Sequence, residues 1–169
     1  MDHGYDLAHR QFVHAVLAGW EAGGAQLQGA NFTGADLRQA RLTEADARGA
    51  IFDGADLTEA DLTRALLQGA SLQRARLHRT LFPQALLISA RCDGAEVEGA
   101  DFTAANLEWA WLTGVDFRCA SVAYALFLNA RGLSEAMCAT IEAKGGFTGA
   151  APFILGRELY ERPTRQGEG

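Results

Sequence analysis

A five-residue spacing of apolar side chains constrains this chain more than any other feature of its sequence. From Ala25 onward an apolar residue, here called the central residue, recurs at every fifth position from Leu27 to Phe127 without an insertion. Seventeen of these 21 central residues are Leu or Phe, and Ala stands two positions before the centre in 19 of the 21 units. Thr80 and Val115 replace that Ala. A register held for a hundred residues indicates one repeated backbone unit.

Neither regular secondary structure gives a period of five. On an α-helix each step of five residues rotates by about 140° beyond a full turn, so the apolar residues would spiral around every side. On a straight strand a step of five moves the side chain to the opposite face. A chain that bends once per unit sends both its Ala and its central residue inward. Four bends of about 90° close a coil in about 20 residues, and coils stack about 4.8 Å apart.

Segments such as residues 30–37, ANFTGADL, repeat Ala, then Asn or Asp, then Phe or Leu. This pattern resembles the pentapeptide-repeat family, and the resemblance covers about residues 25–129. It implies an all-β fold, a right-handed quadrilateral β-helix of about five coils. We therefore expect a pentapeptide-repeat solenoid over residues 25–130.

The ends of a solenoid need caps, because both ends expose apolar interior and unpaired edges. In the N-terminal segment 1–24 the sequence favours an amphipathic cap helix over residues 6–22, begun by Asp6 and ended by Gly23 and Gly24. Its apolar side would consist of Phe12, Val13, Val16, Leu17 and Trp20. In the C-terminal segment 131–169, Ser134 can begin a second helix that carries Met137, Cys138 and Ile141. An apolar tail follows, and it can take part in dimerisation.

One outer face is unusually apolar when positions 20 apart are placed on the same face. This apolar strip contains Leu66, Leu86, Ile88, Trp109, Leu126 and Leu128. Such a strip is covered by a second subunit or by the chain's own tail, with Phe153, Ile154 and Leu155, unless its members are scattered exposed residues. Trp111 stacks between Arg91 and Arg131 in the same register, which predicts a cation–π contact. These ten apolar and aromatic residues, including Trp111, are the predicted interface.

The chain is acidic, with a net charge of −6. The acidic side chains that would form an interaction surface are Asp36, Asp46, Asp56, Glu59, Asp61, Glu96, Glu98, Asp101 and Asp116. A band rich in arginine separates two acidic bands along the chain; it contains Arg64, Arg74, Arg76, Arg79 and Arg91. Because these arginines fall on three faces, we do not expect direct binding of nucleic acid.

The sequence indicates no enzyme. A filled interior leaves no cleft, and the acidic residues repeat on a solvated surface, so we expect no catalytic, cofactor or metal site. The three cysteines, Cys92, Cys119 and Cys138, form no metal or redox motif, which favours a reduced, cytoplasmic protein. No apolar run is long enough to span a membrane.

Two functions stay open. The first is a rod-like scaffold for protein interactions. The second follows from the resemblance to quinolone-resistance members of the family, which are dimeric rods that mimic B-form DNA and bind DNA gyrase or topoisomerase IV. Their acidic surface reaches the partner and their C-terminal helical cap forms the homodimer. Charge weakens the second reading, because residues 25–129 carry only 13 acids against 9 arginines, whereas B-DNA carries about one negative charge per 1.7 Å.

Overall fold

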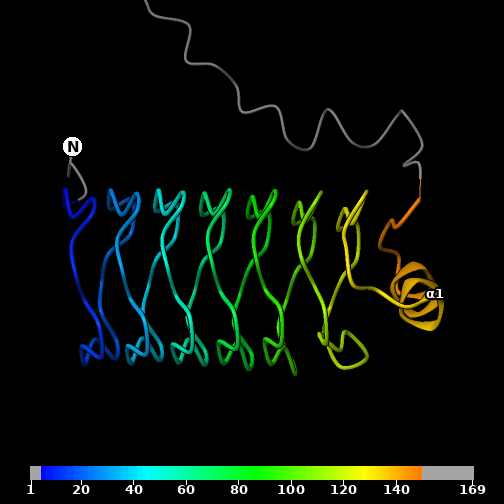
Figure 1. The fold of residues 1–169 in the computed structure, drawn as a ribbon, viewed down its shortest axis with the longest axis horizontal. Coiled ribbons are helices and arrows are strands. Elements are labelled where there is room, and N and C mark those ends of the chain that lie inside the picture. Colours follow the sequence, from blue (N-terminus) through cyan, green and yellow to red (C-terminus); the bar gives the residue numbers. More distant parts are fainter. Residues whose placement is uncertain (1–4, 150–169) are drawn as a thin grey trace, which may run out of the picture.

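A computed structural model describes residues 5–149 of the chain. Its backbone forms a rod of stacked coils, shown end to end in Figure 1. Parallel bridges join residues 20 apart, from Asp6 with Gln26 to Trp111 with Arg131, and one bridge falls in nearly every unit of five. Each coil therefore has four sides of five residues, and about six coils stack between the two ends.

Each corner of a coil is a tight turn that starts at the central residue. In one example the Ala30 N–H donates to the Leu27 carbonyl at 3.0 Å, and Gly29 has a φ of +62°. A turn with positive φ at its third residue suits glycine, as in type II turns. Between residues 5 and 149, fourteen non-glycine residues also adopt positive φ, among them Arg74 at +54° and Gln84 at +58°. Stacking against the neighbouring coils therefore imposes this turn even where the residue type does not favour it.

The interior is filled by the two inward positions of each unit. The Ala and the central residue are buried throughout residues 25–127. Phenylalanines 20 apart stack face to face, with centroids 5.0 Å apart for Phe32 and Phe52 and 4.9 Å apart for Phe82 and Phe102. Thr80, which replaces an Ala, is fully buried, and its hydroxyl donates to the Leu57 carbonyl at 2.7 Å. The spacing of five thus builds a solid interior.

The predicted N-terminal helix over residues 6–22 is wrong. These residues form the first coil, because Asp6, Gln11, Val16 and Glu21 pair with residues 20 positions later. The central residues of this coil, Leu7, Phe12, Leu17 and Ala22, continue the same five-residue series. Its Ala positions hold Tyr5, Arg10 and Trp20 as well as Ala15, and this irregularity concealed the repeat. Bulky side chains fit there because no described coil lies beneath the first one.

The C-terminal end is closed by helix α1, Glu135–Ala143, which Figure 1 shows against the last coil. Ser134 is its N-cap, and the Met137 N–H donates to the Ser134 hydroxyl oxygen at 3.2 Å. Ile141 is fully buried under the coils. After the helix, Phe147 pairs with Leu126 and continues the ladder by one more bridge. Both the helix and its Ser134 cap agree with the sequence-based expectation.

The ladder is interrupted once near this end. Glu96 and Asp116 stand 20 residues apart, yet no bridge joins them, and the Gly99 N–H bonds to the Cys119 carbonyl rather than to that of Arg118. Val115 occupies the position that Ala fills elsewhere. Because its branched side chain needs more room, the coil bows outward at residues 115–119. Phe117 has Val97 rather than an aromatic ring 20 residues before it, and it packs edge-on against Phe127 of another side, at 80°.

Candidate functional site

The predicted acidic residues divide between three faces of the rod. Six of the nine lie on the face whose central residues include Leu37, Leu57 and Leu77. This acidic face carries Asp36, Asp56, Glu59, Glu96, Glu98 and Asp116. Asp46 lies on the face of the apolar strip, and Asp61 and Asp101 lie on a third face. The coil register therefore brings most, but not all, of the predicted residues together.

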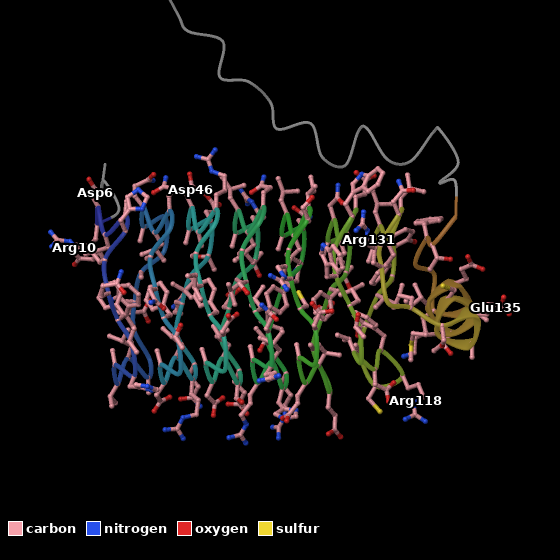
Figure 2. The ribbon with its side chains drawn as sticks, in the orientation of Figure 1. Asp6, Arg10, Asp46, Arg118, Arg131 and Glu135 are labelled. Carbon is pink, nitrogen blue, oxygen red and sulfur yellow. The ribbon has the colours of Figure 1, made fainter. Side chains whose placement is uncertain are left out.

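Several of these acids are neutralised within their own turn. Arg38, Arg48 and Arg118 pair with the Asp two residues earlier, at 2.7 Å, 2.6 Å and 2.5 Å. Figure 2 shows Arg118 projecting from the edge of the rod. Its hydrogen bonds hold the pKa of Asp116 at about 2. In the same way, hydrogen bonds from Arg38 and Arg48 lower the pKa values of Asp36 and Asp46.

Other acids are neutralised between coils. Arg64, Arg76 and Arg79 of the central band pair with the acid 20 residues earlier, which is Glu44, Asp56 or Glu59, at 2.8–3.5 Å. Arg76 also reaches Glu96 on its other side, at 4.0 Å. The arginine band is about one coil long, so stacking places it between the two acidic bands. The acidic face is therefore a network of ion pairs, and exposed pairs of this kind contribute little to stability.

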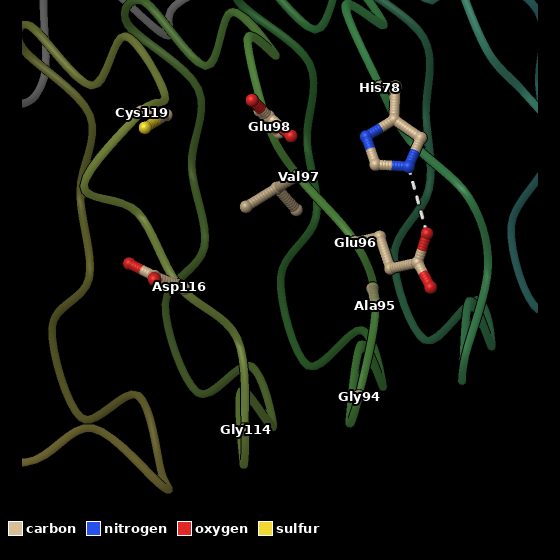
Figure 3. A pocket seen from close by; sticks show the side chains of 9 residues that line it. All are labelled: His78, Gly94, Ala95, Glu96, Val97, Glu98, Gly114, Asp116 and Cys119. Atoms are coloured by element: carbon tan, nitrogen blue, oxygen red, sulfur yellow. Dashed lines mark hydrogen bonds and ion pairs between the residues drawn. The ribbon is translucent and has the colours of Figure 1, made fainter.

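The interruption of the ladder opens a shallow cleft on the acidic face, with a volume of about 450 Å³. Figure 3 shows Val97 at its centre and Glu98, Asp116 and Cys119 around it. His78 lies at one side, where its Nε2 and a Glu96 carboxylate oxygen are 2.8 Å apart. Glu98 has no ion-pair partner among residues 5–149. This lining would favour a positively charged group over a neutral one.

The sequence analysis did not predict this cleft, although it included Glu96, Glu98 and Asp116 in the acidic surface. The signal was present in two small departures from the repeat. Val115 replaces an Ala, and Val97 replaces a Leu or Phe at the centre of the unit across from it. Val97 lines the cleft, and Val115 directly precedes Asp116, which lines it as well. His78 and Cys119 could not be assigned to the cleft without the position of the bowed coil.

The structure places the apolar strip on one face, but most of it is not open. Leu66, Leu86, Ile88 and Leu128 are partly buried by their neighbours along the rod. Leu126 is buried, because Phe147 pairs beside it. Trp109 stays 49% exposed. Phe153, Ile154 and Leu155 lie outside the described residues, so the predicted contact of the tail with this strip is not tested.

Exposed aromatic residues gather where the strip meets the next face. Trp109 and Trp111 stand on either side of one corner, and Trp111 is 41% exposed. The guanidinium carbon of Arg131 lies 4.5 Å from the Trp111 ring centroid, which is one of the two stacking contacts expected from the register. Arg91 pairs through its backbone with Trp111 on the other side. Within residues 5–149, neither Arg91 nor Arg131 has an ion-pair partner. We call these four residues the tryptophan corner.

The described residues offer little for chemical catalysis. Burial raises the pKa of the Cys92 thiol to about 12, so this thiol stays protonated. Among the described residues no group of His, Cys, Asp and Glu is arranged to hold a metal ion. In the same part of the chain, no helix has the length and apolar character needed to cross a membrane.

Comparisons with known proteins agree with this architecture. Two solved structures of QnrB1, a plasmid-mediated fluoroquinolone resistance protein, share the fold with TM-scores of 0.63 and 0.62 and identities of 18% and 20%. The first likeness covers 88% of this chain and 87% of that chain, and the second covers 82% and 76%. A pentapeptide repeat protein from the thylakoid lumen of Arabidopsis thaliana is 25% identical over 93% of this chain and 88% of its own, with a TM-score of 0.45.

A search of curated proteins finds no match. The family model for pentapeptide repeats, in contrast, matches in eight copies over residues 23–58, 52–84 and 84–118. This match spans more than half of the chain. The stacked coils of five-residue sides and the family match together show that the chain belongs to the pentapeptide repeat family.

Proposed function

We propose that this chain is a non-enzymatic, rod-like scaffold that binds a protein partner through the tryptophan corner. The observation that carries this proposal is the exposure of Trp109 and Trp111 beside Arg91 and Arg131 on a rod whose other apolar side chains are mostly buried. Trp and Arg are the residues that most often dominate the energy of protein interfaces.

The chemistry of the corner indicates the kind of surface it fits. Arg64, Arg76 and Arg79 are held by acids of their own chain, whereas Arg91 and Arg131 are not. A partner with carboxylates around an apolar centre can therefore pair with both arginines while it covers the two indole rings. A polyanion such as DNA is a poorer fit, because three of the five arginines of the band are already paired with acids of the chain.

The proposal is tested with the double variant Trp109→Ala/Trp111→Ala as bait in a cell extract of the source organism. A partner identified with the unchanged chain by mass spectrometry should be lost, with binding reduced at least tenfold in a purified assay. Tyr124→Ala is the matched control, since Tyr124 is also an exposed aromatic residue, at 55%, but lies at another corner. Equal losses in both variants, or unchanged binding in the double variant, would exclude the tryptophan corner.

A second candidate is binding to DNA gyrase or topoisomerase IV by mimicry of B-DNA. The shared fold with QnrB1 and the gathering of six acids on one face support it. The ion pairs on that face weigh against it, because they leave far less negative charge than a duplex carries.

The second candidate is tested by gyrase supercoiling in the presence of a quinolone while the protein is titrated. Protection that disappears when Glu98 and Asp116 are both replaced by Lys would support it. Supercoiling that does not change at micromolar protein would exclude gyrase binding. Binding of another protein partner through the tryptophan corner would then remain as the proposed function.

A further inference from the structure

The first coil presents an unpaired edge at the N-terminal end of the rod. In later coils the residue before the centre donates its N–H to the coil beneath, as Asn31 does to the Arg10 carbonyl at 2.9 Å. The N–H groups of Gln11, Val16 and Glu21 occupy the same position in the first coil and have no acceptor among residues 5–149. Such an edge is a template for another strand.

Two exposed side chains on this edge are apolar where later coils carry polar or charged residues, whereas Asp6 and Glu21 on the other two sides keep a charge. Val16 is 82% exposed, and the positions above it hold Asp36, Asp56, Arg76, Glu96 and Asp116. Val13 is 44% exposed, and the positions above it hold Thr33, Asp53, Gln73, Asp93 and Thr113. Native proteins normally protect an open edge with charged side chains. Val13 and Val16 are the apolar members of these two series of stacked residues, and both lie in the first coil, whose edge is unpaired among residues 5–149.

Among residues 5–149, nothing covers the interior at this end either. Phe52, Phe32 and Phe12 form a continuous stack, with centroid distances of 5.0 Å and 4.9 Å and interplanar angles of 4° and 7°. Phe12 is the last ring of the stack, and Trp20 lies 6.0 Å from it. Both are only partly buried, although later residues at the Phe12 position are fully buried.

We propose that a second copy of this chain docks head to head on this edge. Two-fold symmetry sets one first coil against the other, so that edge strands pair in antiparallel fashion and the two Phe12 stacks become one. Gln11–Val13 and Ala15–Leu17 carry no charge, so like-charge repulsion between the two coils is confined to Asp6 and Glu21 on the other two sides. This interface lies at the opposite end of the rod from helix α1 and apart from the tryptophan corner, and it does not depend on the proposed function.

The proposal is tested by light scattering and small-angle X-ray scattering on the full chain. The unchanged protein should be a dimer at micromolar concentration, with a longest dimension about twice that of the monomer. Val13→Lys/Val16→Lys should shift the dissociation constant at least a hundredfold and give a monomer, because it places charges on both facing edges. Leu81→Lys is the matched control: Leu81 occupies the same position in its unit as Val16 and is 39% exposed, but its coil is paired on both sides.

Hydrogen exchange gives a readout that needs no variant. The amides of Gln11, Val16 and Glu21 should exchange at least tenfold more slowly in concentrated protein than in protein diluted to monomer. A monomer at all concentrations, a dimer that persists in the Lys variant, or a dimer lost equally in Leu81→Lys would overturn the proposal. So would a dimer broken by Leu128→Glu but not by the Lys pair, since that result would place the interface on the apolar strip. A dimer that forms without slower exchange of these amides would likewise overturn it.

Discussion

The two ends of this rod solve the same problem differently. At the C-terminal end, helix α1 buries Ile141 completely and Phe147 adds a bridge to the last coil. At the N-terminal end, the repeat simply begins, and Leu7, Phe12, Leu17 and Trp20 are only partly buried. Figure 2 shows helix α1, with Glu135, at one end of the rod and the coil that carries Asp6 and Arg10 at the other. A capped end can hold packed, conformationally restricted residues, whereas an open end tolerates large side chains and leaves them room to move.

The largest expected difference between the ends concerns core truncation. Ile141→Ala should lower the free energy of unfolding by about 2–5 kcal/mol, because it leaves a cavity under the cap. Leu17→Ala should cost about 1 kcal/mol, since Leu17 is partly exposed and its site can close. Urea denaturation of each monomeric variant, in the Val13→Lys/Val16→Lys background, measures both. Equal losses would mean that the first coil is as tightly packed as the cap.

Glycine substitution sharpens the same comparison. A Cβ on Gly132, which has a φ of +87°, would lie 2.6 Å from the Thr113 backbone nitrogen, so Gly132→Ala should cost about 2–4 kcal/mol. A Cβ on Gly34, at +63°, would meet only the His14 ring at 2.5 Å. The His14 ring lies at the open end and can rotate away from the added Cβ. Gly34→Ala should therefore lower the free energy of unfolding by about 1–2 kcal/mol, mainly because of the backbone conformation.

Both glycine variants can be followed by thermal unfolding. Gly49→Ala is the control for the backbone effect alone, because its φ is +64° and no atom lies within 4 Å of the added Cβ. A loss in Gly34→Ala that equals the loss in Gly132→Ala would show that His14 is held as firmly as backbone.

The loss of stability on removing a capping side chain should differ less between the two ends. Ser134→Ala removes the N-cap of α1 and should cost about 1 kcal/mol. Asp6→Ala removes a bond of 3.3 Å to the Ala8 N–H at the open end, and should cost less than about 0.5 kcal/mol. Circular dichroism during denaturation measures both, and Ser134→Asp should restore the first. A larger loss at Asp6 would contradict the view that the first turn is loosely held.

The smallest effect concerns pH. Arg48 lowers the pKa of Asp46, so the pair adds stability that is present above the unfolded pKa of about 3.9 and is lost as the pH falls through the lower folded value. Asp46→Asn should therefore flatten the loss of stability between pH 5 and pH 2 by about 0.3 kcal/mol, because solvent around the half-exposed Arg48 screens the pair. Arg118 lowers the pKa of Asp116 as well, but the Asp116 side chain is 48% exposed against 11% for Asp46, so solvent screens that pair more and Asp116→Asn should flatten the loss less. Urea denaturation of both variants at each pH measures the two effects. A larger effect of Asp116→Asn would contradict this order.

Sequence reasoning was most reliable where the repeat is strict. The register of 20 residues, the filled interior and the contact of Arg131 with Trp111 all follow from one spacing. It was wrong at residues 6–22, because Phe12, Val13, Val16, Leu17 and Trp20 also fit a helical spacing and the Ala signal is weak there. Tyr5, Arg10 and Trp20 stand where later units have Ala, and such large residues fit only because this coil is at the end of the rod. That position becomes apparent only when the coils are assembled.

The candidate site shows a second limit of the same kind. The sequence locates the acids and arginines, and even their bands, but not their pairing. Arg76 reaches Asp56 and Glu96 only because coils bring residues 20 apart into contact. The cleft at Val97 depends on how far Val115 displaces its coil. A residue spacing predicts the register of the coils but not the size of such a displacement.

The missing bridge between Glu96 and Asp116 has a mechanical consequence. In a linear array each repeat is stabilised only by its immediate neighbours, so a weakened junction divides the array into separately cooperative blocks. The block beyond residue 115, which includes α1, should therefore unfold in a step of its own, while the coils before it persist. Pulled from its ends, the molecule should yield in two steps rather than one.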